Sequence, residues 1–419
     1  MLVALQVIIV FGLIIFVHEL GHLIIAKRSG ILCREFAIGF GPKLFAFKRG
    51  ETVYTIRILP LGGYVRMAGE DPEIIEVKTG HDIGVVLNAE KQVEKIVLDQ
   101  KAQYPEAKII NVRKIDMEDE LVVEGYDHED ELKRYDIHPQ AMMVHQRQET
   151  QIAPKDRQFG SKSLRKRAAT LFAGPLANFV LAFVLILSLV LVAGVPVEEA
   201  VIGEVTEDSP AREAGLQPGD RVTEVDDQPV DSWQSMVEIV VANPETPLNF
   251  EVHRGGQQHQ LTITPDAREN QTGEVAGFIG VRIAHEQDVL GSFQYALNVV
   301  WDYAKIVFEG IRLLVTGVFG LDALAGPVGI FQLTGEAAQE GLSYLFHWTA
   351  ILSINIGILN LLPIPALDGG RLVFLVVEGI RGRPIDPHKE GIVTFISFAL
   401  LMLLILVVTW NDIQRLFTN

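Results

Sequence analysis

The stretch FVHELGHLI, residues 16–24, places two histidines and a glutamate inside an otherwise apolar run. The run extends from about Leu2 to Ala26, and a helix that crosses a bilayer needs about 20 apolar residues. Ionisable side chains are costly in such a segment and are usually kept there for function. The stretch therefore predicts a membrane helix that contains a functional site. The segment lacks the positive n-region and the cleavage site of a signal peptide, so we expect a retained helix.

The spacing of these polar residues is typical of a hydrolytic metal site. His18 and His22 are four residues apart, so a helix stacks them on one face, about 6 Å apart along its axis, where both rings can reach one metal ion. Glu19 is rotated by about 100° and can contact a water molecule on that ion without binding the ion. The alternative is a pair of packing histidines that bond to backbone groups.

Asp368 is the predicted third ligand, because a catalytic zinc usually has three protein ligands and one open position. It lies in NIGILNLLPIPALDGGRL, residues 355–372, directly after the last apolar turn of a later membrane segment. The two prolines break that helix, and the two glycines let the backbone turn sharply. The alternative for Asp368 is a helix cap at the membrane surface. The single cysteine, Cys33, excludes an intrachain disulfide and a multi-thiolate metal site.

Composition supports a membrane protein and argues against a nucleic-acid partner. The chain has 419 residues, of which 48% are hydrophobic, and its mean hydropathy is +0.25. Its net charge is −17, from 36 basic and 53 acidic residues. Nucleic-acid binding requires Lys and Arg that neutralise phosphates, so this charge balance excludes it as the main activity.

Four segments are predicted to cross the membrane, and the basic residues orient them. They cover about 2–26, 168–195, 344–364 and 391–410. Lys and Arg cluster after the first segment, before the second, and between the third and fourth. Because basic residues favour the cytoplasmic side, these ends are predicted to be cytoplasmic. Both termini and the connection 196–343 are then extracytoplasmic, and His18 and Asp368 lie at similar depth near the cytoplasmic side.

The connecting segments differ in character. Residues 36–66 alternate apolar and polar residues and predict short strands that lie on or dip into the membrane; a small soluble hairpin is the alternative. Residues 70–160 are acidic and include strand-like patches, and we assign them no function. Residues 198–285 read as a soluble domain, and 293–318 as an amphipathic helix better suited to lying on the membrane than to crossing it.

HELGH in a first membrane helix, NLLPIPALDGG in a later one, and a PDZ-like domain between them resemble the site-2 protease family. The arrangement is similar to the bacterial RseP/RasP type with one PDZ domain. The resemblance covers the four membrane helices, the β-like segment and the PDZ region. It does not account for the acidic insert, and the single PDZ domain departs from members with two.

The predicted fold is a polytopic α-helical membrane protein with four transmembrane helices, a membrane-associated β segment and an inserted α+β PDZ domain. In chain order the predicted parts are the first transmembrane helix (1–35), the β-hairpin segment (36–69), the acidic cytoplasmic insert (70–160), the second transmembrane helix (161–196), the PDZ domain (197–286), an amphipathic helix and connector (287–343), the third transmembrane helix with a cytoplasmic loop (344–390), and the fourth with the C-terminus (391–419).

The resemblance implies roles for individual residues. His18, His22 and Asp368 match the ligands of one catalytic Zn²⁺, and Glu19 matches the general base. Asn360 matches the motif asparagine, which would bind substrate or the developing oxyanion; a polar contact between helices is the alternative.

We also expect a substrate clamp in LPLGGYVRM, residues 59–67. Gly62, Gly63 and Tyr64 would hold an unwound substrate by pairing along a strand edge. In the PDZ region, GFIGV at 277–281 resembles the loop that holds a terminal carboxylate. That domain would either bind peptide ends or exclude bulky substrates by size.

The resemblance implies an intramembrane zinc metalloprotease in the bacterial plasma membrane. Its substrates would be single-span proteins such as anti-sigma factors or signal-peptide remnants. Two other classes stay open at this point: a PDZ scaffold on a membrane anchor with a vestigial metal site, and a metal transporter. Neither requires a glutamate placed beside a metal-bound water, so Glu19 argues against both.

Overall fold

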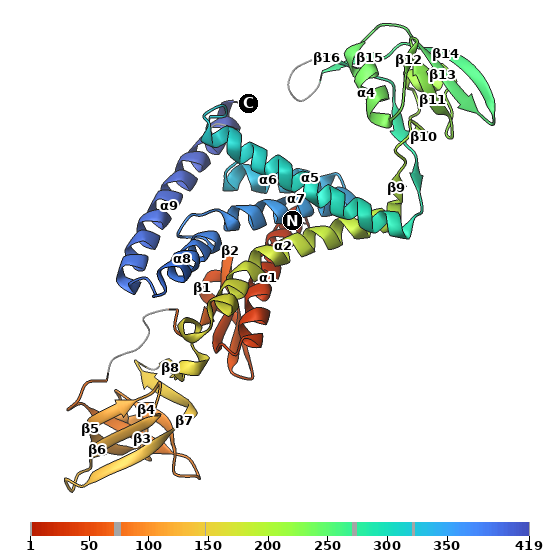
Figure 1. Cartoon of the computed structure of the whole chain (residues 1–419). Helices are drawn as coiled ribbons and strands as arrows, with labels where there is room; N and C mark the ends of the chain where they lie inside the picture. The colour runs from red at the N-terminus through yellow and green to blue at the C-terminus, as the bar shows by residue number, and fades with distance from the viewer. Residues whose placement is uncertain (1, 71–76, 147, 270–274, 321–322, 419) are drawn as a thin grey trace. The chain divides into compact units, whose positions relative to one another are not determined.

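The computed structural model describes residues 2–70, 77–146, 148–269, 275–320 and 323–418, without the side chains of 60, 61 and 418. The side chains of two positions of the predicted clamp, 60 and 61, and residues 71–76 of the acidic insert therefore lie outside the described part of the chain. The chain divides into two compact units (Figure 1). One comprises residues up to Ala182 together with those from Asp302 onward, and the other comprises Phe183–Trp301.

Four described helices are long and apolar enough to cross a membrane. They are α1 (Leu2–Arg28), α2 (Leu164–Ala193), α7 (Leu342–Leu361) and α9 (Pro387–Thr418). The most apolar stretch of α9 is only 6% buried within the protein, as expected for a helix that faces lipid. These helices agree with the predicted polytopic membrane protein. How many of them lie in a bilayer stays a prediction.

Small residues let α1, α2 and α7 approach one another closely. A Cβ added to Gly21 of α1 would collide with the carbonyl of Ala173 in α2. A Cβ added to Gly357 of α7 would lie 3.2 Å from the carbonyl of Pro175, also in α2. Membrane helices gain packing contacts in this way, because lipid supplies no hydrophobic drive between them. The three helices therefore hold their facing side chains at short, defined distances.

Helix α8 (Asp368–Arg381) corrects the predicted loop after the third membrane helix. Helix α7 ends at Leu361, before the first proline, and the chain folds back over residues 362–367. Side chains at Gly369 or Gly370 would collide with backbone carbonyls of this turn. The two glycines thus let α8 start tightly against the end of α7, with Asp368 as its first residue.

The next segment, β1 (Cys33–Arg49) and β2 (Thr52–Met67), forms its own sheet. Residues 35–38 of β1 pair twice, with 53–56 and with 63–66 of β2. Residues 43–49 of β1 pair with 52–57. The second half of β2 is therefore an outer strand of this sheet, and 43–49 is the opposite edge.

The acidic insert folds as a β structure. Its strands are β3 (Asp82–Leu87), β4 (Val93–Val97), β5 (Lys108–Asp116), β6 (Val122–Tyr126), β7 (Leu132–His145) and β8 (Gln148–Gln151), with 3₁₀ turns at Lys101–Gln103, Lys155–Arg157 and Phe159–Ser161. They form a sheet in the order β4-β3-β5-β6-β7-β8, and an additional β4–β7 pairing closes it. Buried residues such as Val85, Ile96 and Ile110 fill its core. The strand-like patches predicted here are present as β5 and β6.

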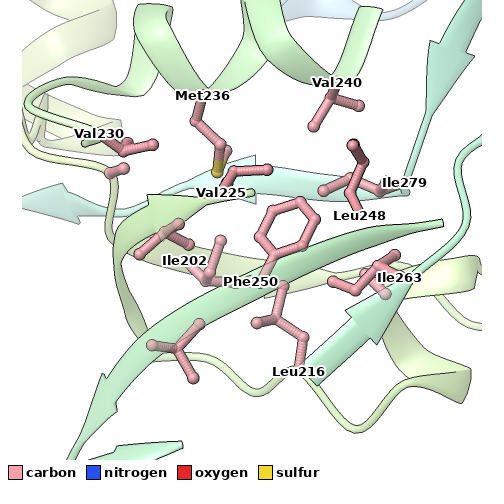
Figure 2. Packing of buried hydrophobic residues seen from close by; sticks show 14 of the residues in the cluster. Ile202, Leu216, Val225, Val230, Met236, Val240, Leu248, Phe250, Ile263 and Ile279 are labelled. Carbon is pink, nitrogen blue, oxygen red and sulfur yellow. The ribbon is translucent and has the colours of Figure 1, made fainter. Parts of the chain in front are cut away.

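The second unit contains a small α+β domain. Its elements are β9 (Val195–Pro196), β10 (Ile202–Val205), α3 (Pro210–Glu213), β11 (Arg221–Val225), β12 (Gln228–Pro229), α4 (Trp233–Ala242), β13 (Leu248–Arg254), β14 (Gln257–Ile263), β15 (Asp266–Glu269), β16 (Val275–Phe278), β17 (Val281–Ile283) and β18 (His285–Glu286). Figure 2 shows Met236 and Val240 of α4 pointing toward Phe250 and Leu248 of β13. One helix thus covers the sheet and closes an apolar core.

The remaining helices are α5 (Val289–Val315) and α6 (Pro327–Gln339). Helix α5 begins four residues earlier and ends three residues earlier than the predicted helix 293–318. It leaves Leu297, Trp301 and Phe308 exposed, with Trp301 66% exposed. Exposed apolar side chains along a helix that also carries charged residues fit a helix at a membrane surface.

Glu51, in the turn between β1 and β2, joins the hairpin to the insert. Its carboxylate accepts hydrogen bonds from both terminal nitrogens of Arg157, at 2.7 and 2.6 Å, from Gln151 at 2.6 Å and from Gln140 at 3.2 Å. The Arg157 guanidinium is the largest cause that lowers the pKa of Glu51 to about 2. The ionised form is therefore bound more tightly in the folded chain than in the unfolded chain.

Substitution Glu51→Gln should loosen the contact between insert and hairpin. We expect the opening free energy of β8 to fall by about 1–2 kcal/mol at pH 7, because charged hydrogen bonds are lost at a partly exposed site. The folded pKa lies below the usual value, so this contribution is complete above pH ~4.5 and is lost as the pH falls toward 2. Native-state hydrogen exchange of β8 measures it, with Glu90→Gln at an exposed site as control. Equal exchange in both variants at pH 7 would contradict the prediction.

Candidate metal centre

One atom from each of three side chains meets at a common point between α1 and the start of α8. His18 Nε2 and His22 Nε2 are 3.3 Å apart. Asp368 Oδ2 lies 3.3 Å from each of them. The ligand atoms of the three residues form a group that could hold one metal ion. The structure thus brings together the three residues that the sequence predicted as ligands.

The geometry of this triangle fits a small four-coordinate ion. Bonds of about 2.0 Å in a tetrahedral site separate the ligand atoms by about 3.3 Å, the edge length found here. Two imidazole nitrogens and one carboxylate oxygen are also a donor set that suits zinc. Asp368 Oδ2 is buried and has no hydrogen-bond partner among the described residues. A cation at the common point would satisfy it.

Helix α2 orients His22. The ring nitrogen Nδ1 of His22 lies 2.8 Å from the backbone carbonyl of Thr170. A carbonyl can only accept, so Nδ1 carries the proton and the lone pair of Nε2 faces the centre. Gly174, one turn later in α2, provides the space that the His22 ring occupies, because a Cβ there would collide with Nε2 of His22.

Further polar contacts hold α8, and with it Asp368, in place. Arg167 of α2 makes two hydrogen bonds to the carboxylate of Glu378 in α8, one of them at 3.0 Å. Arg371, one turn after Asp368, donates to Glu70 at 2.5 Å. Glu70 follows the end of β2, so this ion pair connects the hairpin segment to the helix that begins with the ligand.

Glu19 lies beside the centre and against β2. Its side chain is buried and makes no hydrogen bond or salt bridge to another described residue. A Cβ added to Gly63 would lie 2.8 Å from Cγ of Glu19. The backbone of the outer strand therefore packs directly against the Glu19 side chain. Because the Glu19 carboxylate has no hydrogen bond to the described residues, it can act on a water molecule or a substrate.

The other predicted site residues have different surroundings. Asn360 donates its side-chain amide to the carbonyl of Ile356 in its own helix, at 3.0 Å. Gly62 has φ +115°, and a Cβ there would lie 2.7 Å from the ring of Phe40. Tyr64 stacks on Phe40 with ring centroids 6.3 Å apart. The substrate roles of these residues stay predictions.

The sequence-based prediction missed the contribution of α2. Thr170 and Gly174 lie against His22, and Asn178 Nδ2 is 3.3 Å from His18 Nδ1. The available signal was AGPLAN, residues 173–178, which places a glycine, a proline and an asparagine in an otherwise apolar membrane segment.

Comparison with known proteins supports the geometric reading. Residues 6–404 match the model of peptidase family M50. The chain is 52% identical over 410 residues to the zinc metalloprotease RasP of Geobacillus kaustophilus, covering 98% of this chain and 97% of that protein. It is 48% identical over 412 residues to the regulator of sigma-W protease RasP of Bacillus subtilis, covering 98% of each.

Among solved structures, the PDZ domain of an SdrC-like protein from Listeria monocytogenes matches with 23% identity and a TM-score of 0.18. The match covers 21% of this chain and 90% of that domain.

Substitution Gly174→Ala should weaken metal binding. The added methyl group would lie 2.2 Å from His22 Nε2 and would displace the ring. We expect metal affinity to fall by at least about tenfold, the lower end of the effect of losing a group that supports a ligand. Metal content of the purified protein after dialysis measures this. Gly12→Ala in α1 is the matched control, because no atom lies within 4 Å of its added Cβ. Equal metal content in the two variants would contradict the prediction.

Proposed function

The chain belongs to peptidase family M50, and on this premise we propose that it is an intramembrane zinc protease. It would hydrolyse peptide bonds within or near the membrane-spanning segments of single-span proteins. The observation that carries the proposal is the triangle of donor atoms from His18, His22 and Asp368, with edges of 3.3 Å, beside the buried carboxylate of Glu19.

The three donor residues are the proposed zinc ligands. When bound, zinc supplies Lewis acidity, which makes water a nucleophile near neutral pH and polarises a peptide carbonyl. His18 and His22 are held by helix packing, and Asp368 by the tight turn before α8. The ligands are thus positioned before any ion or substrate arrives, which reduces the reorganisation needed for reaction.

Glu19 is the proposed general base and acid. Its carboxylate takes a proton from the attacking water as the new C–O bond forms. It then delivers that proton to the leaving nitrogen as the C–N bond breaks. The helix places Glu19 about 100° around from His18, so it can reach the nucleophile without taking a ligand position.

The outer strand of β2 is the proposed substrate clamp. A helical substrate hides its carbonyl groups in backbone hydrogen bonds and must unwind before attack. Residues 63–66 pair with β1 on one side only in the described pairings, and Gly63 lies against Glu19. An unwound peptide that adds to the free edge would present its backbone next to the glutamate. Gly62 and Tyr64 would shape the same edge.

Sidedness and partners are part of the proposal. The basic residues at the helix ends place the metal centre near the cytoplasmic side of the bacterial plasma membrane, with four helices crossing. The α+β domain and both termini would then be extracytoplasmic. This domain is proposed to be of PDZ type, and to receive peptide ends near residues 277–281 or to exclude bulky proteins.

The proposed substrate class is supported by one of the relatives. The Bacillus subtilis relative is a regulator of sigma-W protease. By analogy we propose membrane-bound anti-sigma factors as one substrate class of this chain, and signal-peptide remnants as another. Both are single-span segments, so both would need to unwind at the clamp before hydrolysis.

Substitution Glu19→Gln should abolish hydrolysis and leave the metal in place. Loss of a general base costs about 10²–10⁴-fold in rate, whereas the three ligands are unchanged. The measurement is zinc content together with cleavage of a single-span substrate in detergent or liposomes. Glu207→Gln, an exposed substitution in the other unit, serves as control. Unchanged cleavage by the Glu19 variant would rule out the proposed protease mechanism.

Proline substitutions test the clamp. Successive N–H groups of a strand point to opposite sides, so Tyr64→Pro and Val65→Pro each remove an N–H, one toward β1 and one toward the free edge. We expect the variant that loses the outward N–H to lose cleavage while it keeps its zinc. The same pair of substitutions at Phe45 and Ala46, on the opposite edge of the sheet, should spare cleavage. Full activity of both the Tyr64 and Val65 variants would eliminate the clamp.

A further inference from the structure

We propose that Asn178 is a positioning residue for His18: its side-chain carbonyl accepts a hydrogen bond from His18 Nδ1–H and thereby directs Nε2 at the metal. The inference rests on the zinc site proposed above, and it extends that site to a residue on α2. Asn178 lies 160 positions from His18 in the chain. It is completely buried.

Contact between the two side chains is direct. Nδ2 of Asn178 lies 3.3 Å from Nδ1 of His18. The opposite nitrogen of that ring, Nε2, is a corner of the donor triangle. Asn178 therefore touches the back of the ligand and not the metal position, which is the place of a residue that orients a ligand.

The chemistry of the imidazole decides which atom of the amide must face it. A histidine that uses the Nε2 lone pair for a metal is neutral and carries its proton on Nδ1. Nδ1 is then a donor, and it needs an acceptor. The NH₂ group of Asn178 is also a donor, so an NH₂ group turned toward Nδ1 would set two N–H groups against each other.

Half a turn about the last side-chain bond of Asn178 exchanges its oxygen and its nitrogen and resolves this conflict. The amide oxygen then accepts from Nδ1–H at the same separation. The amide atom that points away from His18 is buried without a partner among the described residues. Oxygen or nitrogen would be equally unpartnered at that position. The contact with His18 is thus the interaction that distinguishes the two orientations.

His22 shows the same design. Its Nδ1 donates to the backbone carbonyl of Thr170, also on α2, at 2.8 Å. Both histidines would then be supported by carbonyl oxygens of one helix, eight residues apart along it. A carbonyl on each ring sets the same tautomer in both ligands.

Helix α7 holds Asn178 in position. Ser353 of α7 donates its hydroxyl to the backbone carbonyl of Asn178 at 2.9 Å. A Cβ added to Gly357 of α7 would lie 3.4 Å from Cβ of Asn178. These contacts fix the backbone of Asn178 against α7, so that its side-chain amide is held within reach of His18.

Metal affinity tests the proposal without reference to proteolysis. Purified full-length protein is loaded with zinc, and transfer of zinc to a chelator is followed for wild type, Asn178→Leu and Asn178→Asp. Leucine has similar size and no acceptor, and we expect it to weaken zinc binding by about 10–100-fold. Aspartate keeps an acceptor oxygen, as in carboxylate–histidine–zinc arrangements, and we expect affinity close to wild type.

Thr349→Val in α7 is the matched control, because Thr349 is a buried polar residue whose one hydrogen bond among the described residues goes to the carbonyl of Leu345 in its own helix. It should leave zinc affinity unchanged. Thermal unfolding of each metal-free variant compares any loss of folding with this control.

The outcomes separate the inference from the proposed function. Wild-type affinity in Asn178→Leu would overturn the positioning role. Equal loss in Asn178→Asp and Asn178→Leu would overturn the acceptor assignment, because an acceptor alone should suffice. Failure of the wild-type protein to bind zinc would instead overturn the metal site itself.

Discussion

The rest of the structure depends on one electrostatic constraint. Three lone-pair donors, His18 Nε2, His22 Nε2 and Asp368 Oδ2, are held 3.3 Å apart in a buried site. Without a cation between them such atoms repel one another, and a buried carboxylate oxygen without a partner is costly. The protein maintains this arrangement through close helix packing and a tight turn. The packing of these elements holds the three donor atoms together despite their repulsion. A metal ion that binds between the donors would offset the free-energy cost of this arrangement.

Helix α2 connects most of these supports. Its glycine and alanine surface admits α1 at short distance, and its carbonyl at Thr170 orients His22. Its Arg167 binds Glu378 of α8. None of the proposed ligands and not the proposed general base comes from α2, yet this helix contacts both histidines and binds α8. These contacts account for the glycine, proline and asparagine that lie in one short stretch of an otherwise apolar segment.

The β1–β2 hairpin connects the candidate metal centre to the insert. Gly63 brings the outer strand onto Glu19, and Arg371 pairs with Glu70 just after that strand. At the other end of the hairpin, Glu51 binds Arg157 and Gln151 from the insert. The insert, for which the sequence indicated no function, is thus anchored to the same hairpin whose outer strand lies against Glu19.

The local features of this protein were determined by its sequence. The four apolar segments and the pairing of His18 with His22 follow from helix periodicity, because residues four apart share a face whatever surrounds them. Asp368 was recognisable because prolines and glycines mark the turn that sets its position. Only the tertiary structure decided the partners from distant segments. Thr170 and Asn178 lie 148 and 160 residues from the histidines they contact, and the double pairing of β1 with β2 depends on register. Such contacts arise from packing of whole elements, and no local periodicity encodes them.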